Sequence, residues 1–223
     1  MHAYLLPILA VVIGVVIAFI TKHKQVLHTR LLLSFSGAFL LAVTLFNLLP
    51  ELYLHLSPKI IGLLIMMGIL IQIILEFFSR GAEHGHVHFQ KTKHFPWLLF
   101  VSLCIHSFLE GFPMHEHNSI VYGVVVHKIP IATLLAVFLF ESAFKKSQIF
   151  IFLLVFALTT PLGTFVSNQN WLAPNHLNYM NAIVVGIFLH ISTTIIFETG
   201  EGHKFNISKL LAIILGVSIA YFL

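Results

Sequence analysis

Long apolar runs alternate with short polar segments along the whole chain. Each run holds about 20 residues, which is the length that an α-helix needs to cross a hydrocarbon layer of about 30 Å. The pattern therefore predicts an all-α fold, a polytopic membrane helix bundle in which residues 1–223 form a single membrane-embedded domain. The eight expected transmembrane helices are 3–21, 31–49, 60–78, 95–113, 119–140, 148–166, 178–197 and 207–223.

Composition supports a membrane environment and indicates an orientation. The chain is 58% hydrophobic and 9% charged, with a mean hydropathy of +0.98, whereas soluble domains carry about 25% charged residues. Basic residues stay on the cytoplasmic side of a membrane, and here they gather in the odd-numbered loops, while the even-numbered loops hold only Lys59. We therefore expect a multi-pass cell-membrane protein with both termini outside. This distribution explains the basic excess without a nucleic-acid partner.

Two of the expected spans resemble each other. One contains SGAFLLAVTLFNLLPE and ends at Glu51, and the other contains VGIFLHISTTIIFE and ends at Glu198; both run Gly-x-Phe-Leu and close on glutamate. Because the two spans cross in opposite directions, a common ancestor would make them an inverted repeat, which is a frequent plan in transporters. Chance similarity between two apolar segments is the alternative.

The fourth span carries two ionisable residues, His106 and Glu110. An ionisable side chain at the centre of a bilayer costs at least about 2.5–3.5 kcal/mol, so each needs a reason. Their spacing of four residues places both on one helical face, close enough to share an ion. An imidazole with a carboxylate suits a divalent transition metal, but a hydrogen-bonded pair that fastens two helices is an equal alternative.

The fifth span, YGVVVHKIPIATLLAVFLFE, adds His127, Lys128 and Pro130. Proline removes one backbone hydrogen bond, so we expect a kink or a break in the helix there. Irregular backbone at this depth is tolerated where it lines a cavity, and His127 beside it can supply a third ligand. Lys128 points about 100° away around the helix and needs a carboxylate partner or water, with Glu110 the nearest candidate by depth.

These segments resemble the ZIP (Zrt/Irt-like) family of divalent-metal transporters. HSFLEG resembles the family pattern His-Asn-x-x-Glu/Asp-Gly, HKIPIA resembles a subgroup with His-Lys-x-Pro, and NLLPE resembles the family's second span. The resemblance implies eight spans, outward termini, a histidine-rich loop between spans three and four, and a homodimer. It also implies alternating access, in which the transport helices move as a body against a scaffold.

Family members commonly hold two metals side by side, and the resemblance divides the residues of this chain between the two sites. Ligands of the first site are retained, whereas those of the second are replaced. We therefore expect a single-metal site in which the Lys128 ammonium takes the place and the charge of the second ion. The retained ligands are His106, Glu110 and His127, and the replaced positions are Ser107, Lys128, Ile131 and Thr160.

Further histidines and glutamates are peripheral candidates. His84, His86 and His88 alternate within 79–94, an expected histidine-rich cytoplasmic loop, and clustered histidines bind transition metals weakly. They would capture metal, or simply lie in solvent. The outer residues His115 and His117 would gather ions or are there by chance. Three more are candidates for the ion path, with packing or snorkelling to water as the plainer explanation: His190, Glu51 and Glu198.

The resemblance implies a transporter that moves a divalent metal inward, with the lipid bilayer and the ion as its partners. Zinc leads, although Fe²⁺, Mn²⁺ or Cd²⁺ also fit two histidines and a carboxylate. We expect no cofactor beyond the transported metal and no enzyme activity. Two alternatives stay open: a membrane-embedded metal-dependent hydrolase, since such ligands can activate water, and a transport-inactive metal sensor, since the second site is replaced.

Overall fold

The computed structural model describes residues 1–21, 26–79, 95–115, 118–169, 173–198 and 207–223. Every regular element in these ranges is a helix, so the all-α prediction is confirmed. The elements are α1 (His2–Ile20), α2 (Val26–Val43), η1 (Thr44–Leu48), α3 (Leu49–His55), α4 (Pro58–Ser79), α5 (Trp97–Glu110), η3 (Phe112–His115), α6 (Asn118–Glu141), α7 (Lys146–Ser167), α8 (Pro174–Glu198) and α9 (Ile207–Tyr221).

Seven helical stretches among the described residues are long and apolar enough to cross a membrane. They correspond to the first seven predicted spans, and the second of them runs through α2, η1 and α3 as Thr29–His55. The eighth predicted span corresponds to α9, an apolar helix of 15 residues that covers about 22 Å at 1.5 Å per residue. The fold is a polytopic helical bundle, and α9 is shorter than expected. The inverted repeat stays a prediction.

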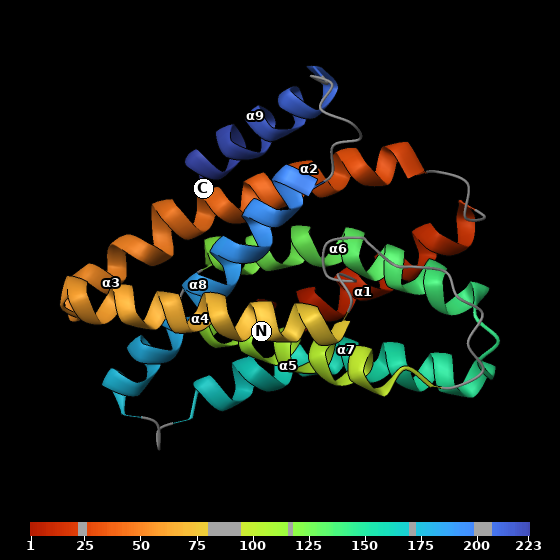
Figure 1. The fold of residues 1–223 in the computed structure, drawn as a ribbon, viewed down its shortest axis with the longest axis horizontal. Helices are drawn as coiled ribbons and strands as arrows, with labels where there is room; N and C mark the ends of the chain where they lie inside the picture. The colour runs from red at the N-terminus through yellow and green to blue at the C-terminus, as the bar shows by residue number, and fades with distance from the viewer. Residues whose placement is uncertain (22–25, 80–94, 116–117, 170–172, 199–206) are drawn as a thin grey trace.

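The long helices pack in two groups. In the first group, α1 packs on α6 and α7, and α5 packs on α7. In the second group, α2 packs on α9 and α8, and α4 packs on α8. The groups meet where α2 touches α6 and where α4 touches α5. Figure 1 shows α9 along α2 at one edge of the bundle and the α5–α7 pair at the opposite edge. We call α1, α5, α6 and α7 the site group and the others the flanking group.

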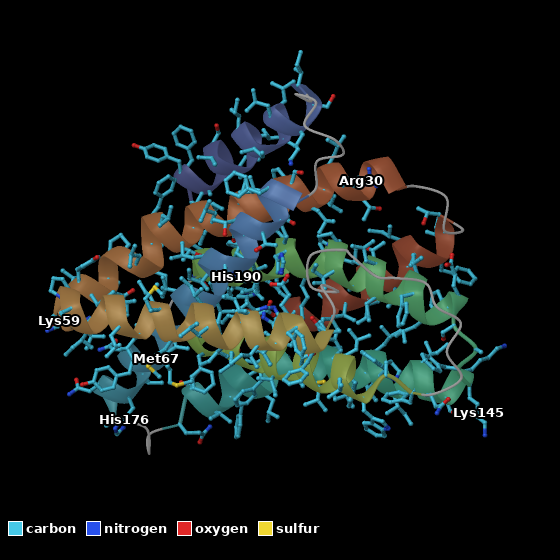
Figure 2. All side chains as sticks on the ribbon, in the orientation of Figure 1. Arg30, Lys59, Met67, Lys145, His176 and His190 are labelled. Carbon is cyan, nitrogen blue, oxygen red and sulfur yellow. The ribbon has the colours of Figure 1, made fainter. Side chains whose placement is uncertain are left out.

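Large apolar side chains point away from the bundle, as expected where lipid is the solvent, because lipid tails are as apolar as leucine. Examples are Leu9 on α1, Met67 on α4 and Leu211 on α9. Figure 2 shows Lys59 and His176 toward one end of the bundle and Arg30 and Lys145 toward the other. This agrees with helix connections that alternate between two ends. Which end faces the cytoplasm stays a prediction.

Of the kink or break expected at Pro130, the break is wrong, and the kink stays a prediction. The helix α6 continues through Pro130 from Asn118–Glu141 without interruption. Its neighbours explain why, because α1 packs so tightly here that a Cβ on Gly14 would overlap the backbone of Ile129 and Thr133. Neighbouring helices are one of the features that make proline tolerable inside a membrane helix.

Candidate metal-binding site

Helix α5 carries two predicted ligands on its buried face. Residues four apart lie one above the other on a helix, and the side chains of His106 and Glu110 are only 5% and 2% exposed. His106 Nε2 lies 2.8 Å from Glu110 Oε1. The face is held against α7 by a close helix contact, since a Cβ on Gly163 would overlap the carbonyl oxygen of Phe108. The backbone that presents both ligands is therefore fixed by packing.

Helix α6 brings the third predicted ligand to the same place. His127 is buried, and its ring meets the ring of His106 edge to face, with centroids 6.5 Å apart. One donor atom from each of His106, Glu110 and His127 lies within 4.8 Å of the other two. Among the described residues, this is the one group of three or more histidine, cysteine or acidic donors that comes so close. We call these three residues the triad.

The second carboxylate oxygen of Glu110 faces an ammonium group. Lys128 Nζ donates to Glu110 Oε2 at 2.8 Å and to Ser107 Oγ at 2.6 Å, so the expected pairing of Lys128 with Glu110 is confirmed. The ammonium also lies 4.7 Å from the centroid of the Phe156 ring, where a cation–π attraction adds to its stabilisation. Lys128 is 2% exposed. Glu110 thus contacts the His106 imidazole through one oxygen and the Lys128 ammonium through the other.

A directed chain of hydrogen bonds extends from the ammonium to α7. Because Lys128 can only donate, Ser107 Oγ accepts from it. The Thr160 hydroxyl donates to the Ser107 carbonyl oxygen at 2.8 Å, so the Ser107 hydroxyl donates to Thr160 Oγ1 at 3.0 Å. Three of the four replaced positions therefore form one network, and the fourth, Ile131, is buried at 5% exposure.

The triad has the donors for one divalent transition metal. Two imidazoles and a carboxylate are a ligand set that Zn²⁺ uses. Donors bound to one tetrahedral ion at about 2.0–2.2 Å lie about 3.5 Å apart, so small side-chain rotations bring the triad to that spacing. Three protein ligands leave one coordination position to water. The open position lets a bound ion leave the site.

None of the other predicted site residues whose side chains the structure describes joins the triad. His190, on α8, makes its contact elsewhere, with Nε2 lying 2.7 Å from Glu76 Oε2 on α4. Glu51 lies half-buried in the first turn of α3, and Glu198 is the last residue of α8. His115 ends η3. The remaining metal-capture candidates, His84, His86, His88 and His117, lie outside the described residues, as does most of the segment 79–94.

Sequence reasoning missed two residues that touch the site, Gln72 and Phe156. Gln72 Oε1 lies 3.3 Å from His106 Nδ1, and a lone amide inside an apolar span was the signal that could have identified it. Phe156 carried no signal, because one aromatic among many in an apolar helix is ordinary. The π-helical turn η1, directly before the helix that contains Pro50, was also not expected.

Comparison with known proteins shows the family to which the chain is similar. The family described as ZIP Zinc transporter matches residues 79–223, which include all of the triad. The chain is 26% identical over 168 residues to Protein zntD of Dictyostelium discoideum, covering 62% of this chain and 24% of that protein. It is 33% identical over 90 residues to Zinc transporter ZIP1 of Danio rerio, covering 37% and 30%.

A third relative, Zinc transporter ZIP1 of Takifugu rubripes, is 29% identical over 156 residues, covering 62% of this chain and 50% of that protein. The matches thus span half of the relatives' length or less. The family is one of transporters rather than enzymes, which agrees with the expected lack of enzyme activity. Because the family match covers more than half of its residues, this chain belongs to the ZIP zinc transporter family.

Proposed function

We propose that this chain carries a divalent transition-metal ion, most readily Zn²⁺, into the cytoplasm through one metal site between α5 and α6. The ligands are His106, Glu110 and His127. Alternating access exposes this site first to one side of the membrane and then to the other. The transported metal is the substrate, and the chain needs no further cofactor.

One observation carries this proposal, the convergence of the triad inside the bundle. Its donor atoms lie within 4.8 Å of one another on helices that are apolar and long enough to cross a membrane. Three ionisable groups so placed are costly to bury unless they serve a purpose. The names of two of the relatives, which are zinc transporters, agree with zinc as the ion.

We also propose that each chain binds a single metal ion, because Lys128 occupies the position that a second ion would take. Its ammonium donates to Glu110 and to Ser107 and lies over Phe156. A second cation next to Glu110 would have to displace this group. Lys128 therefore supplies one fixed positive charge where a two-metal relative would hold an ion.

A gain-of-site variant tests the replacement. Lys128→Asp combined with Ile131→Glu and Thr160→Glu restores acidic donors around Glu110, so bound zinc should rise from one ion per chain toward two. Elemental analysis of the purified, dialysed protein measures this. The control variant combines Lys128→Asn with Ile131→Gln and Thr160→Gln, because these amides match the acids in shape without the charge. An unchanged zinc content in the acidic variant would contradict the replacement.

We also propose an orientation in the membrane and an oligomeric state. Both termini lie outside the cell membrane, the segment 79–94 faces the cytoplasm, and two copies form a homodimer. Accessibility of single cysteines introduced at Lys59 and Lys145 to an impermeant thiol reagent tests the orientation in a Cys104→Ser background. Labelling of position 145 but not 59 from outside intact cells would contradict it. Mass measurement of the detergent-solubilised protein tests the dimer.

Transport itself is tested with the purified protein in liposomes. Zn²⁺ influx should saturate with concentration, and the His127→Ala variant should lose it. His176→Ala is the matched control, because His176 is exposed in the first turn of α8 and is not one of the triad residues. Repeating the assay with isotopes of iron, manganese and cadmium, with and without a pH gradient, gives the selectivity and the driving force. Saturable binding without flux would identify a sensor and contradict transport.

A further inference from the structure

Gln72 is a polar residue inside an otherwise apolar helix. It lies on α4 close to exposed apolar side chains such as Leu70 and Ile73, yet its own side chain is fully buried. Burying an amide without a hydrogen bond costs about 1–3 kcal/mol by the measure of protein mutations. A glutamine is therefore expected here only if a group inside the bundle requires it.

The group that Gln72 contacts is a ligand of the triad. Its side-chain oxygen Oε1 lies 3.3 Å from His106 Nδ1. An amide oxygen can only accept a hydrogen bond, so this contact requires a proton on Nδ1. The ion then takes the lone pair of Nε2, and it replaces the proton through which Nε2 contacts Glu110 Oε1 at 2.8 Å when no ion is bound.

We propose that Gln72 is a positioning residue, which holds His106 in the tautomer and ring orientation that metal binding requires. This inference rests on the proposed function, because it assumes that the triad binds the ion. Outer hydrogen-bond partners of metal-binding histidines fix the ring in this way, and their loss costs about 10–100-fold in metal affinity. Gln72 does not touch the ion itself.

The contact also joins the two groups of helices. Gln72 belongs to the flanking group and His106 to the site group, and α4 and α5 meet directly. A movement of the site group along α4 by about one or two ångströms would break a hydrogen bond of this length. The triad then binds the ion most tightly in the arrangement in which Gln72 reaches His106, so release is coupled to the movement.

Two variants separate positioning from packing. Gln72→Met keeps the length of the side chain without an acceptor, whereas Gln72→Glu keeps the acceptor. Ser79→Ala is the control, because Ser79 is buried on the same helix and its hydroxyl bonds to the Glu76 carbonyl of its own helix. Zinc affinity is measured by competition with a chromophoric chelator, and the visible spectrum of bound Co²⁺ reports the ligand geometry.

Gln72→Met should weaken zinc binding by about 10–100-fold and raise the apparent KM of uptake similarly, while the maximal rate per folded transporter does not fall. Its Co²⁺ spectrum should change. Gln72→Glu should restore the affinity, and Ser79→Ala should match the wild type. Wild-type affinity in Gln72→Met, a fall in the maximal rate alone, or no rescue by Gln72→Glu would each overturn the inference.

The same measurements on the triad keep the two proposals apart. If His106→Gln and His127→Ala bind zinc as well as the wild type does, the proposed function fails. If they lose zinc and Gln72→Met does not, the proposed function stands and the positioning role of Gln72 fails.

Discussion

Among the described residues, two histidine–glutamate pairs have nearly the same contact distance. His106 and Glu110 approach to 2.8 Å within α5, and His190 and Glu76 approach to 2.7 Å between α8 and α4. The side chains of the first pair are 5% and 2% exposed, whereas those of the second are 19% and 25% exposed. The two pairs therefore have nearly equal contact distances but differ in how far their side chains are exposed.

The surroundings decide which pair suits an ion. The first pair has His127 as a third donor and the Lys128 ammonium behind its carboxylate. No third histidine, cysteine or acidic donor of the described residues joins the second pair. A metal ion exchanges its water ligands for protein ligands only where several donor atoms converge. The number of converging donors and the burial of the side chains therefore distinguish the two pairs, whereas the contact distance does not. The second pair is better suited to joining α4 and α8.

The largest effect should come from removing the ammonium that distinguishes the first pair. Lys128→Met leaves the Glu110 carboxylate buried beside an apolar side chain, and breaking a buried ion pair costs about 3–5 kcal/mol. The thermal unfolding temperature of the metal-free protein should fall sharply, and zinc should restore part of it. Lys59→Met, at an exposed lysine of α4, should change little. Equal unfolding temperatures of the two variants would contradict a stabilising role of Lys128 at the site.

Next in size is the loss of a triad ligand. His106→Gln keeps a polar side chain and spares the contact between Lys128 and Glu110, but it removes an imidazole donor. Zinc affinity should fall by at least about 100-fold, since even outer partners of metal ligands cost about 10–100-fold. The same replacement at His190 provides the comparison and should keep the affinity. Isothermal titration measures both, and the reverse ranking would contradict the assignment.

A smaller effect should follow from disturbing the packing under the first pair. Gly163→Ala places a methyl group against the Phe108 carbonyl oxygen, and overpacking of this kind costs about 1–3 kcal/mol. Because α5 has to move, zinc affinity should fall together with the unfolding temperature. Gly62→Ala is the matched control, since a Cβ there meets nothing within 4 Å. Similar behaviour of the two variants would show that α5 is not held by this contact.

The smallest effect is expected at the second pair. Glu76→Gln keeps a hydrogen-bond acceptor for His190, and partly exposed pairs are worth about 0–1 kcal/mol. The unfolding temperature should fall slightly, with zinc affinity and uptake unchanged. A strong loss of uptake with normal stability would place the pair on the ion path, as the sequence allowed for His190.

The sequence predicted the fold well because membrane helices have a simple signature. Apolar length alone located seven of the eight spans, and a spacing of four was enough to place His106 and Glu110 on one face. The shortness of α9 escaped prediction because the apolar run 207–223 is continuous to its last residue, while the helix ends at Tyr221. Boundaries depend on capping and packing, which hydrophobicity does not encode.

Contacts across helices were harder to predict. The position of Lys128 relative to Glu110 followed from depth, but its contact with Phe156 depends on how α6 and α7 are turned. The partner of Gln72 likewise depends on which face of α4 meets α5. The break expected at Pro130 does not occur, because the tolerance of a proline depends on the helix packed beside it and not only on its own residue type.

The most direct test is the position of zinc in crystals of the protein, read from anomalous diffraction at the zinc edge. One peak within about 2.0–2.2 Å of His106 Nε2, a Glu110 carboxylate oxygen and a ring nitrogen of His127, with the Lys128 ammonium on the far side of Glu110, is the predicted result. A peak between Glu110 and Thr160 with the lysine displaced, or zinc bound away from these three residues, would contradict the single-metal site.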